Sequence, residues 1–275
     1  MSPSLPYSDP SRLAARIRRR AVEMVHSAAA SHIGSCLSAA DILAHLYGGC
    51  LRVDPTRPDW PDRDRFILSK GHAAAALYAV LAEQGFFPVE LLDSYGQDDT
   101  ALAGHCAHAV AGVEVSTGSL GHGLSIGCGM ALAAKRDGRG YRVFVLLGDG
   151  ECDEGQVWEA ALFAHQNELD NLVAIVDHNK LQGLGALDEV LSLQPFAEKW
   201  RAFGFSSVEI DGHDHGQIAR ALAKVPRESA RPTAVIAHTV KGKGVSFMEG
   251  SLAWHYKSPN DSQLVQAIGE LEVAL

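Results

Sequence analysis

The chain has 275 residues, of which 47% are apolar and 21% are charged, a composition that excludes a disordered, collagen-like or coiled-coil protein. Its 24 Lys and Arg against 33 Asp and Glu give a formal net charge of −9, which argues against a nucleic-acid-binding protein that neutralises phosphates. The five cysteines form no C-x-x-C pair and are odd in number, which favours reduced thiols in the cytosol over a disulfide framework.

No segment is predicted to cross a membrane or to direct export. The first 25 residues lack the uninterrupted apolar run of a signal peptide. The longest apolar stretch, residues 73–82, is about half as long as a membrane-spanning helix. We therefore expect a cytoplasmic protein without a membrane partner.

The amino-terminal segment, residues 11–50, is predicted to be helical. Ser11 is expected to cap a helix that runs to about Ala30. Ser38, with Asp41 three residues later, is expected to open a second helix.

Basic residues cluster in the first predicted helix, as the run RIRRR at residues 16–20. Leu13, Ile17 and Ala21 lie at helical spacing on the other side of that helix. The run is therefore predicted to be the solvated face of an amphipathic helix rather than an RNA contact.

From residue 66 onward, short apolar runs alternate with helix-length segments, and residues 53–64 form a Pro- and Asp-rich loop before them. The predicted strands are 66–68, 141–147, 171–176, 206–210 and 233–238, and the predicted helices are 72–84, 123–136, 155–168 and 214–224. Nearly continuous β-branched runs at this spacing are typical of buried parallel strands. The sequence predicts an α/β fold, with a doubly wound, mostly parallel sheet and helices on both faces, in a single domain over residues 1–275.

Polar residues follow two of the predicted strands where each ends. Asp149 stands between two glycines after the strand at 141–147, and Asn179 follows the next strand 30 residues later. Because ligands bind beyond the carboxyl ends of parallel strands, both side chains are expected at one edge of the sheet. A carboxylate, an amide oxygen and a nearby carbonyl suit Mg²⁺ or Ca²⁺. The structural alternative is a capping Asp and a turn Asn.

A second glycine-rich segment, residues 117–127, contains G-x-G-x-x-x-G and runs into a predicted helix. It is close to a dinucleotide fingerprint, and Asp149 lies where a ribose-binding acid would be expected. A nicotinamide-dependent oxidoreductase therefore stays open as an alternative. Against it, Asp149 is followed by another glycine-rich turn and helix.

Five histidines lie in loops beside small residues, which predicts a polar cleft that handles protons and oxyanions. They are His32, His72, His105, His122 and His255. Two other polar runs are expected to have minor roles. Residues 211–215 form a turn in which Asp214 caps the next helix, and Lys241 in KGKG is at most an auxiliary phosphate contact.

Six segments, covering residues 12–262, resemble the amino-terminal part of transketolase and occur in that family's order. They are SHIGSCLSAADIL, FILSKGHAAAALYAVL, GVEVSTGSLGHGLSIGCGMALAAK, GDGECDEGQVWEAALFAHQNELDNLVAIVDHNK, TVKGKGVSFME and WHYKSP. The fourth resembles the thiamine diphosphate motif, in which GDG is followed by a later Asn. The resemblance implies that thiamine diphosphate and Mg²⁺ are the cofactors, with Ca²⁺ or Mn²⁺ able to substitute for Mg²⁺.

The resemblance also implies roles for individual residues. Asp149, Asn179 and the Leu181 carbonyl would hold the metal ion that bridges the two phosphates. The cofactor would be bound by His72, Gly118, Leu120, Asp149, Gly150, Glu151, Asn179 and His255, with the Gly118 carbonyl and Leu120 at the aminopyrimidine. His32, His72, His105 and His255 would act in catalysis on sugar substrates, and Glu154 would lie at a contact between subunits.

Three departures from full-length transketolases are visible in the sequence. This chain has SHIG where they usually have GHPG, GHCA where they have GHPE, and LGHG where they have LGQG. In the last motif, His122 replaces a glutamine near the cofactor. With WHYKSP, these variants look like the short subunit of a split transketolase. They leave the ketose and the aldose open.

The resemblance further implies a missing partner. Transketolases place the glutamate that contacts the pyrimidine on a second α/β domain, and this chain ends only twenty residues after His255. We therefore expect the partner to be a pyrimidine-domain (carboxy-terminal) subunit, in an α₂β₂ assembly. Alternatives are a subunit of a 2-oxo acid dehydrogenase or deoxyxylulose phosphate synthase type, and a non-catalytic scaffold subunit.

Overall fold

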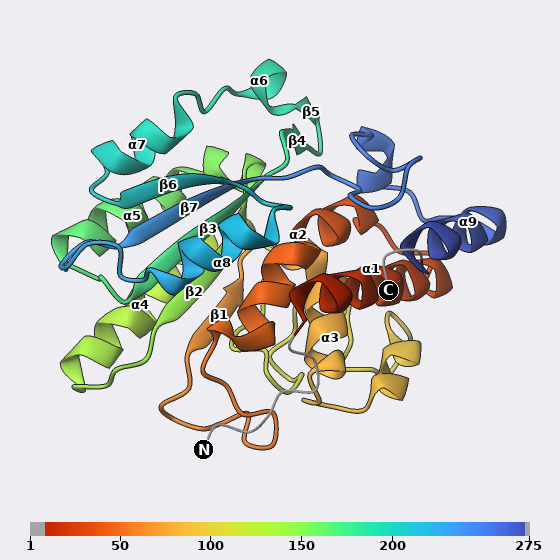
Figure 1. Cartoon of the computed structure of the whole chain (residues 1–275), viewed down its shortest axis with the longest axis horizontal. Helices are drawn as coiled ribbons and strands as arrows, with labels where there is room; N and C mark the ends of the chain where they lie inside the picture. Colours follow the sequence, from red (N-terminus) through yellow and green to blue (C-terminus); the bar gives the residue numbers. More distant parts are fainter. Residues whose placement is uncertain (1–8, 273–275) are drawn as a thin grey trace.

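Five parallel strands form the central sheet, in the order β1-β2-β3-β7-β6, in a computed structural model that describes residues 9–272 (Figure 1). The strands are β1 (Arg65–Leu68), β2 (Val143–Gly148), β3 (Leu172–His178), β6 (Ser206–Asp211) and β7 (Thr233–His238). All five predicted strands are confirmed, and every strand pair in this sheet is parallel. The ends of the predicted 1–275 domain, residues 1–8 and 273–275, lie outside the described residues.

Helices cover both faces of this sheet, which confirms the doubly wound α/β fold. One face carries α1 (Pro10–Ser27), α2 (Ile33–His45), α3 (Ala74–Glu83) and α8 (His215–Ala223). The other carries α4 (His122–Arg136), α5 (Gly155–Gln166) and α7 (Phe196–Ala202), while α9 (Asp261–Glu272) packs beside α1.

The strands are buried on both sides, and alternate residues enter different hydrophobic clusters. In β2, Phe144 and Leu146 pack toward α1, α2 and α3, whereas Val143, Val145 and Leu147 pack toward α4 and α5. Burial on both faces requires apolar side chains at successive positions. This explains why the strand runs in the sequence are continuous rather than alternating.

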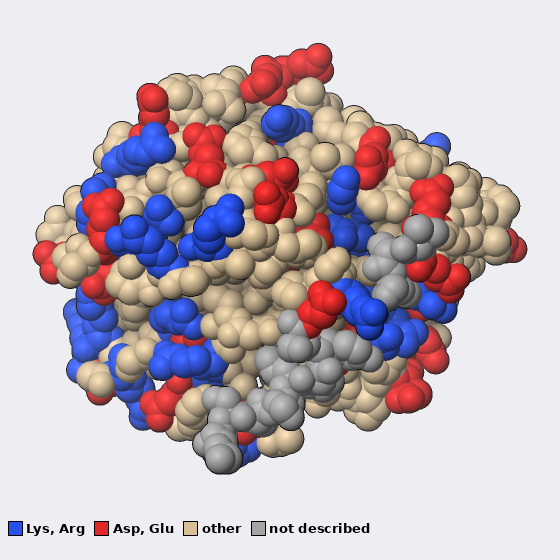
Figure 2. Space-filling model, viewed as in Figure 1, with Lys and Arg blue, Asp and Glu red and all other residues tan. Residues whose placement is uncertain are grey.

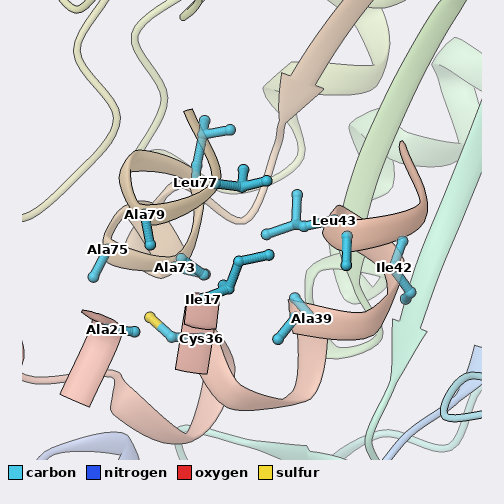
Figure 3. Close-up of a cluster of buried hydrophobic side chains, with 14 of the residues drawn as sticks. Ile17, Ala21, Cys36, Ala39, Ile42, Leu43, Ala73, Ala75, Leu77 and Ala79 are labelled. Carbon is cyan, nitrogen blue, oxygen red and sulfur yellow. The ribbon is translucent and has the colours of Figure 1, made fainter. Parts of the chain in front are cut away.

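The contact between α1, α2 and α3 is built largely from small side chains. Figure 3 shows Ala21 of α1, Cys36 and Ala39 of α2, and Ala75 and Ala79 of α3 in one cluster. Small residues let helix backbones approach closely, so these helices form a dense layer against the sheet.

The remaining elements are short. They are a π-helical turn (Leu46–Cys50), 3₁₀ turns (Gly71–Ala73, Val89–Ser94, Gly150–Asp153 and Leu252–His255), α6 (Leu187–Val190), and a hairpin of β4 (Leu181–Gln182) and β5 (Gly185–Ala186). The hairpin, α6, α7 and α9 were not predicted from the sequence.

The predicted starts of the first two helices are wrong. Asp9, not Ser11, caps α1, because its Oδ1 accepts hydrogen bonds from the backbone N–H groups of Ser11 (3.0 Å) and Arg12 (3.5 Å). The second helix begins at Ile33, five residues before the predicted cap. Ser38 is buried inside it and donates to Asp177 Oδ2 at 2.6 Å.

The prediction of an amphipathic α1 with a solvated arginine face is confirmed only in part, because Leu13, Ile17 and Ala21 are buried as expected but the arginines are not fully solvated. Arg18 is buried and its Nη1 donates to Asp41 Oδ1 at 3.1 Å. Arg16 and Arg20 both pair with Glu83, a buried residue of α3. Buried carboxylates on neighbouring helices therefore use these arginines as counter-charges.

The surface and the cysteines agree with the compositional analysis. Figure 2 shows acidic and basic side chains interspersed over the face in view, without a continuous basic area. All five cysteines are free. Among the described residues, every helix is too short or too polar to span a bilayer.

Candidate active site

A cavity of about 360 Å³ opens at the carboxyl ends of β1, β2 and β3. All eleven site residues predicted from the sequence line it: His32, His72, His105, Gly118, Leu120, Asp149, Gly150, Glu151, Asn179, Leu181 and His255. Ser35, Lys70, Gly148, Gln182, Gly183, Leu184 and Lys241 complete the lining. Segments far apart in the sequence meet here because parallel strands end at the same edge of the sheet.

Three residues with oxygen donors follow β2 and β3 and line the cavity. Backbone groups fix the Asp149 carboxylate, since Oδ1 accepts from Gly150 N at 2.8 Å and Oδ2 from Lys180 N at 2.5 Å. Asn179 Oδ1 accepts from Leu181 N at 3.1 Å. With the Leu181 carbonyl, these groups form a mixed carboxylate, amide and carbonyl set, which is the kind that Mg²⁺ or Ca²⁺ prefers.

Glycine is required beside Asp149 for steric reasons. A Cβ atom on Gly150 would lie 2.7 Å from Gln182 Cβ, too close for any other residue without a shift of the hairpin. The backbone of this turn can thus approach a bound group closely.

Four histidine rings, with His32 at their centre, gather on one side of the cavity. The centroid of the His32 ring lies 5.1 Å from that of His72, 5.8 Å from His105 and 5.0 Å from His255. His32 itself has φ 71°, a left-handed conformation that brings it to the start of α2.

Burial and neighbouring positive charges disfavour the protonated form of these rings. Burial, then the charges of His105 and Lys241, lower the pKa of His32 from 6.5 to about 4. Burial and Lys241 lower the pKa of His255 to about 3, and burial and Lys70 lower the pKa of His72. These three imidazoles are therefore neutral at pH 7, and each can donate one hydrogen bond and accept another.

Two buried lysines add positive charge to the cavity. Lys70 is 1% exposed, forms an ion pair with Asp177 and donates to the Ser35 carbonyl at 3.0 Å. Lys241 Nζ donates to the Leu181 carbonyl at 3.0 Å and lies 3.0 Å from His255 Nδ1. Burial and the charge of Lys70 lower the pKa of Lys241 to about 8.

Sequence reasoning missed Lys70 and gave Lys241 only a minor place. A usable signal was present, because Lys70 closely follows β1 as the polar residues do after β2 and β3.

Glu151 lines the cavity, but its carboxylate is engaged by the protein. Ser69 Oγ and Gly121 N (2.9 Å) donate to Oε1, and Gly148 N donates to Oε2 at 3.0 Å. Burial raises the pKa of this carboxyl group. The side chain joins the turn after β2 to the loop that precedes α4.

The sequence matches one known family over nearly its whole length. Residues 10–269 match the family described as "Transketolase, thiamine diphosphate binding domain". The chain belongs to this family.

Similar proteins include individual subunits of transketolases, and these are comparable in length. One, from the apulose-4-phosphate transketolase of Phocaeicola vulgatus, is 45% identical over 254 residues, 92% of this chain and 90% of that protein. Another, from the 6-deoxy-6-sulfo-D-fructose transketolase of Clostridium sp., is 43% identical over 257 residues, 93% of this chain and 94% of that protein.

Solved transketolases share the fold but are longer. The transketolase of Campylobacter jejuni superposes with a TM-score of 0.90 and 31% identity over 96% of this chain. The match covers only 43% of that structure's chain. This member of the transketolase family thus spans less than half the length of that relative.

Family membership favours thiamine diphosphate chemistry over the nicotinamide alternative. The structure also gives a packing reason for the presence of a glycine in residues 121–127. A Cβ atom on Gly127 would lie 2.6 Å from Val145 Cγ2, so this glycine lets α4 pack closely against β2. It serves helix–sheet packing and does not line the cavity.

The prediction that five loop histidines share one polar cleft is wrong for His122, which lies outside the cavity lining, as does Glu154, a residue named from the transketolase resemblance. His122 is exposed at the start of α4, with Nδ1 3.0 Å from the Leu120 carbonyl oxygen. Glu154 is exposed just before α5. Asp214 caps α8 as predicted, since its Oδ1 accepts from Gln217 N at 3.0 Å.

Proposed function

We propose that this chain is the thiamine diphosphate-binding subunit of a split transketolase, which moves a two-carbon ketol unit from a ketose to an aldose. One observation carries the proposal: a single cavity combines an oxygen-donor set, two buried ammonium groups and four histidines in a chain of the transketolase family. Residues 1–275 would act as one thiamine diphosphate-binding domain.

The charges of the cavity suit the cofactor's diphosphate. Asp149, Asn179 and the Leu181 carbonyl would hold Mg²⁺, or Ca²⁺ or Mn²⁺ in its place. Lys70 and Lys241 provide positive charge for the phosphate oxygens, and the Gly150 backbone would contact them. An acidic protein can thus bind a polyanion without a basic surface.

The neutral residues suit the rest of the cofactor and a sugar. We assign the Gly118 carbonyl and Leu120 to the aminopyrimidine and His72 to the diphosphate. When bound, thiamine diphosphate supplies the carbanion chemistry of ketol transfer. His32, His105 and His255 would bind sugar hydroxyl groups and move protons, because neutral imidazole both donates and accepts.

The partner would be a pyrimidine-domain subunit, most simply in an α₂β₂ assembly. Support comes from relatives of similar length that are named as transketolase subunits. Glu154 would lie at a contact between subunits. The relatives' names contain different sugars, so the proposal extends to ketoses as a class.

The five free cysteines support a reducing compartment, the cytoplasm.

The test is an assay of the purified chain with thiamine diphosphate, Mg²⁺, a ketose donor and an aldose acceptor. Activity is expected only after addition of a pyrimidine-domain chain. Full turnover by this chain alone would refute the need for a partner. If the chain bound no thiamine diphosphate with or without a partner, the cofactor assignment itself would be wrong.

A further inference from the structure

Asp177, the second-to-last residue of β3, has a buried carboxylate next to the cavity that accepts hydrogen bonds from four side chains. Its side chain is 0% exposed. Its Oδ2 accepts from Ser38 Oγ at 2.6 Å, from Asn179 Nδ2 at 3.4 Å and from Lys70 Nζ, and its Oδ1 accepts from Thr239 Oγ1.

These four donors come from four separate segments. Ser38 belongs to α2, Lys70 follows β1, Thr239 follows β7 and Asn179 follows β3 itself. Both oxygens are occupied by protein donors, and Asp177 is not part of the cavity lining. Its carboxylate therefore lies behind the cavity wall and joins the segments that form the wall.

Two of the four donors, Lys70 and Asn179, line the cavity. We propose that Asp177 is a positioning residue, whose buried carboxylate holds the Lys70 ammonium and the Asn179 amide in place for diphosphate and its metal ion. This inference rests on the proposed function and deepens it, because it assigns the support of that site to a residue outside it.

The physical reason is the cost of an isolated buried charge. Lys70 is 1% exposed, and besides Asp177 its ammonium donates to the Ser35 carbonyl. A carbonyl dipole does not neutralise an ammonium group, and removal of one partner of a buried ion pair is far more costly than replacement of both. Without the Asp177 charge, the ammonium can no longer be held at its position beside the cavity.

The Asp177 contacts also reach the second cavity lysine. Thr239, held by Asp177, begins the segment that leads to Lys241. The intervening Val240 N–H donates to His213 Nε2 at 2.8 Å. The segment that leads to Lys241 is thus fixed at Thr239 by Asp177 and at Val240 by His213.

The experiment measures the binding of inorganic pyrophosphate with Mg²⁺ to the full-length chain by calorimetry, with thermal melts of the same samples. The variants are Asp177→Asn, Lys70→Met and the double variant. Asp177→Asn keeps the shape of the side chain and removes its charge. We expect it to weaken pyrophosphate binding about tenfold or more, because the Lys70 ammonium loses its buried counter-charge and with it its fixed position.

The double variant tests whether Asp177 acts through Lys70. In the Lys70→Met background, we expect Asp177→Asn to change the affinity by less than about threefold, because the amide oxygen can still accept from Asn179 Nδ2 and no ammonium group remains to lose its counter-charge. Equal and additive losses in both backgrounds would overturn the inference. If Asp177→Asn does not fold, Lys70→Met is compared with the double variant, which buries neither charge, and a further tenfold loss in the double variant would overturn it.

Asp64→Asn is the matched control. Asp64 is also fully buried and ion-paired, with Arg52 (2.8 Å) and Arg142 (2.6 Å), but it precedes β1 at the opposite end of the strands. We expect it to lower the melting temperature while leaving the pyrophosphate affinity within about twofold. If Asp177→Asn behaved like Asp64→Asn, the inference would be wrong and the proposed function would stand. If the wild-type chain bound neither pyrophosphate nor thiamine diphosphate, the proposed function would fail first.

Discussion

At the scale of single residues, Asp149 is held by backbone donors from both neighbouring strand ends, so its carboxylate is oriented before any ligand arrives. Asp149→Ala removes one of the three proposed metal ligands. Thiamine diphosphate with Mg²⁺ at 100 times its Kd should stabilise the wild-type chain by about 2.7 kcal/mol, and the variant should show almost none of this. Thermal melts with and without cofactor measure the difference.

The control for this variant is Glu159→Gln, a substitution in α5 away from the cavity lining. It should retain the full cofactor-dependent shift. An equal shift in Asp149→Ala and wild type would show that Asp149 is not a ligand.

His32 gives a prediction about pH. Its pKa is lowered from 6.5 in the unfolded chain to about 4 in the folded chain, mainly by burial. Between these values the unfolded chain binds more protons, so the stabilising contribution of neutral His32 is present above pH 6.5 and is lost as the pH falls toward 4.

His32→Asn should therefore reduce the loss of melting temperature between pH 7 and pH 5. Asn is suited to the left-handed backbone at this position, so the substitution removes the titrating ring without adding strain. The measurement is a pair of melts for each protein, and an unchanged pH dependence would argue against the lowered pKa of His32.

At the scale of elements, the start of α1 depends on Asp9. Its carboxylate accepts from two backbone N–H groups of the first turn, and Pro10 follows at a position that suits proline. Asp9→Ala should lower the free energy of unfolding by about 1 kcal/mol, the usual value of an N-cap. Urea denaturation measures it.

Ser11→Ala is the matched substitution in the same turn. Because the structure places Ser11 inside the helix, we expect it to change the free energy of unfolding by less than about 0.5 kcal/mol. A larger loss from Ser11→Ala than from Asp9→Ala would restore Ser11 as the cap.

Sequence patterns predicted the elements in which buried apolar positions recur at a regular spacing. The strands are buried on both faces and are therefore continuously apolar, so they can be recognised in the sequence. The β4–β5 hairpin has two residues in each strand and α7 has seven residues, so neither is long enough to display a period.

The candidate site was predicted to the extent that its residues follow strands. Asp149 and Asn179 were found because adjacent parallel strands end together. The Lys70–Asp177 pair joins residues 107 positions apart, and no local pattern contains that information. The same holds for Arg18 and Asp41, whose burial contradicts the predicted solvation at one of the four arginines in residues 16–20.

At the scale of the whole molecule, the cavity has an exposed apolar side chain beside its opening. Leu184, at the tip of the β4–β5 hairpin, is 81% exposed and lines the cavity. The hairpin is tied to the segment after the Leu252–His255 turn by the Tyr256 hydroxyl, which donates to the Gly183 carbonyl at 2.8 Å. This is the surface that a partner chain would cover if it closed the cavity.

The proposed assembly predicts a defined mass. A mixture with a pyrimidine-domain chain should give, in light scattering after size exclusion, a complex with two copies of each chain, well above twice the 29.4 kDa of this subunit. A complex containing one copy of each chain would contradict the α₂β₂ arrangement, although not the need for a partner.

The two ends of the parallel sheet carry different kinds of buried charge. Before β1, Asp64 with its two arginines closes the sheet at the end away from the cavity, whereas the polar residues around Asp177 surround the cavity at the other end. Substitutions that adapt the enzyme to a new sugar can accumulate on the loops of one end while the ion pairs of the other end preserve the fold. Evolution can therefore change the substrate range of such a scaffold without weakening the scaffold itself.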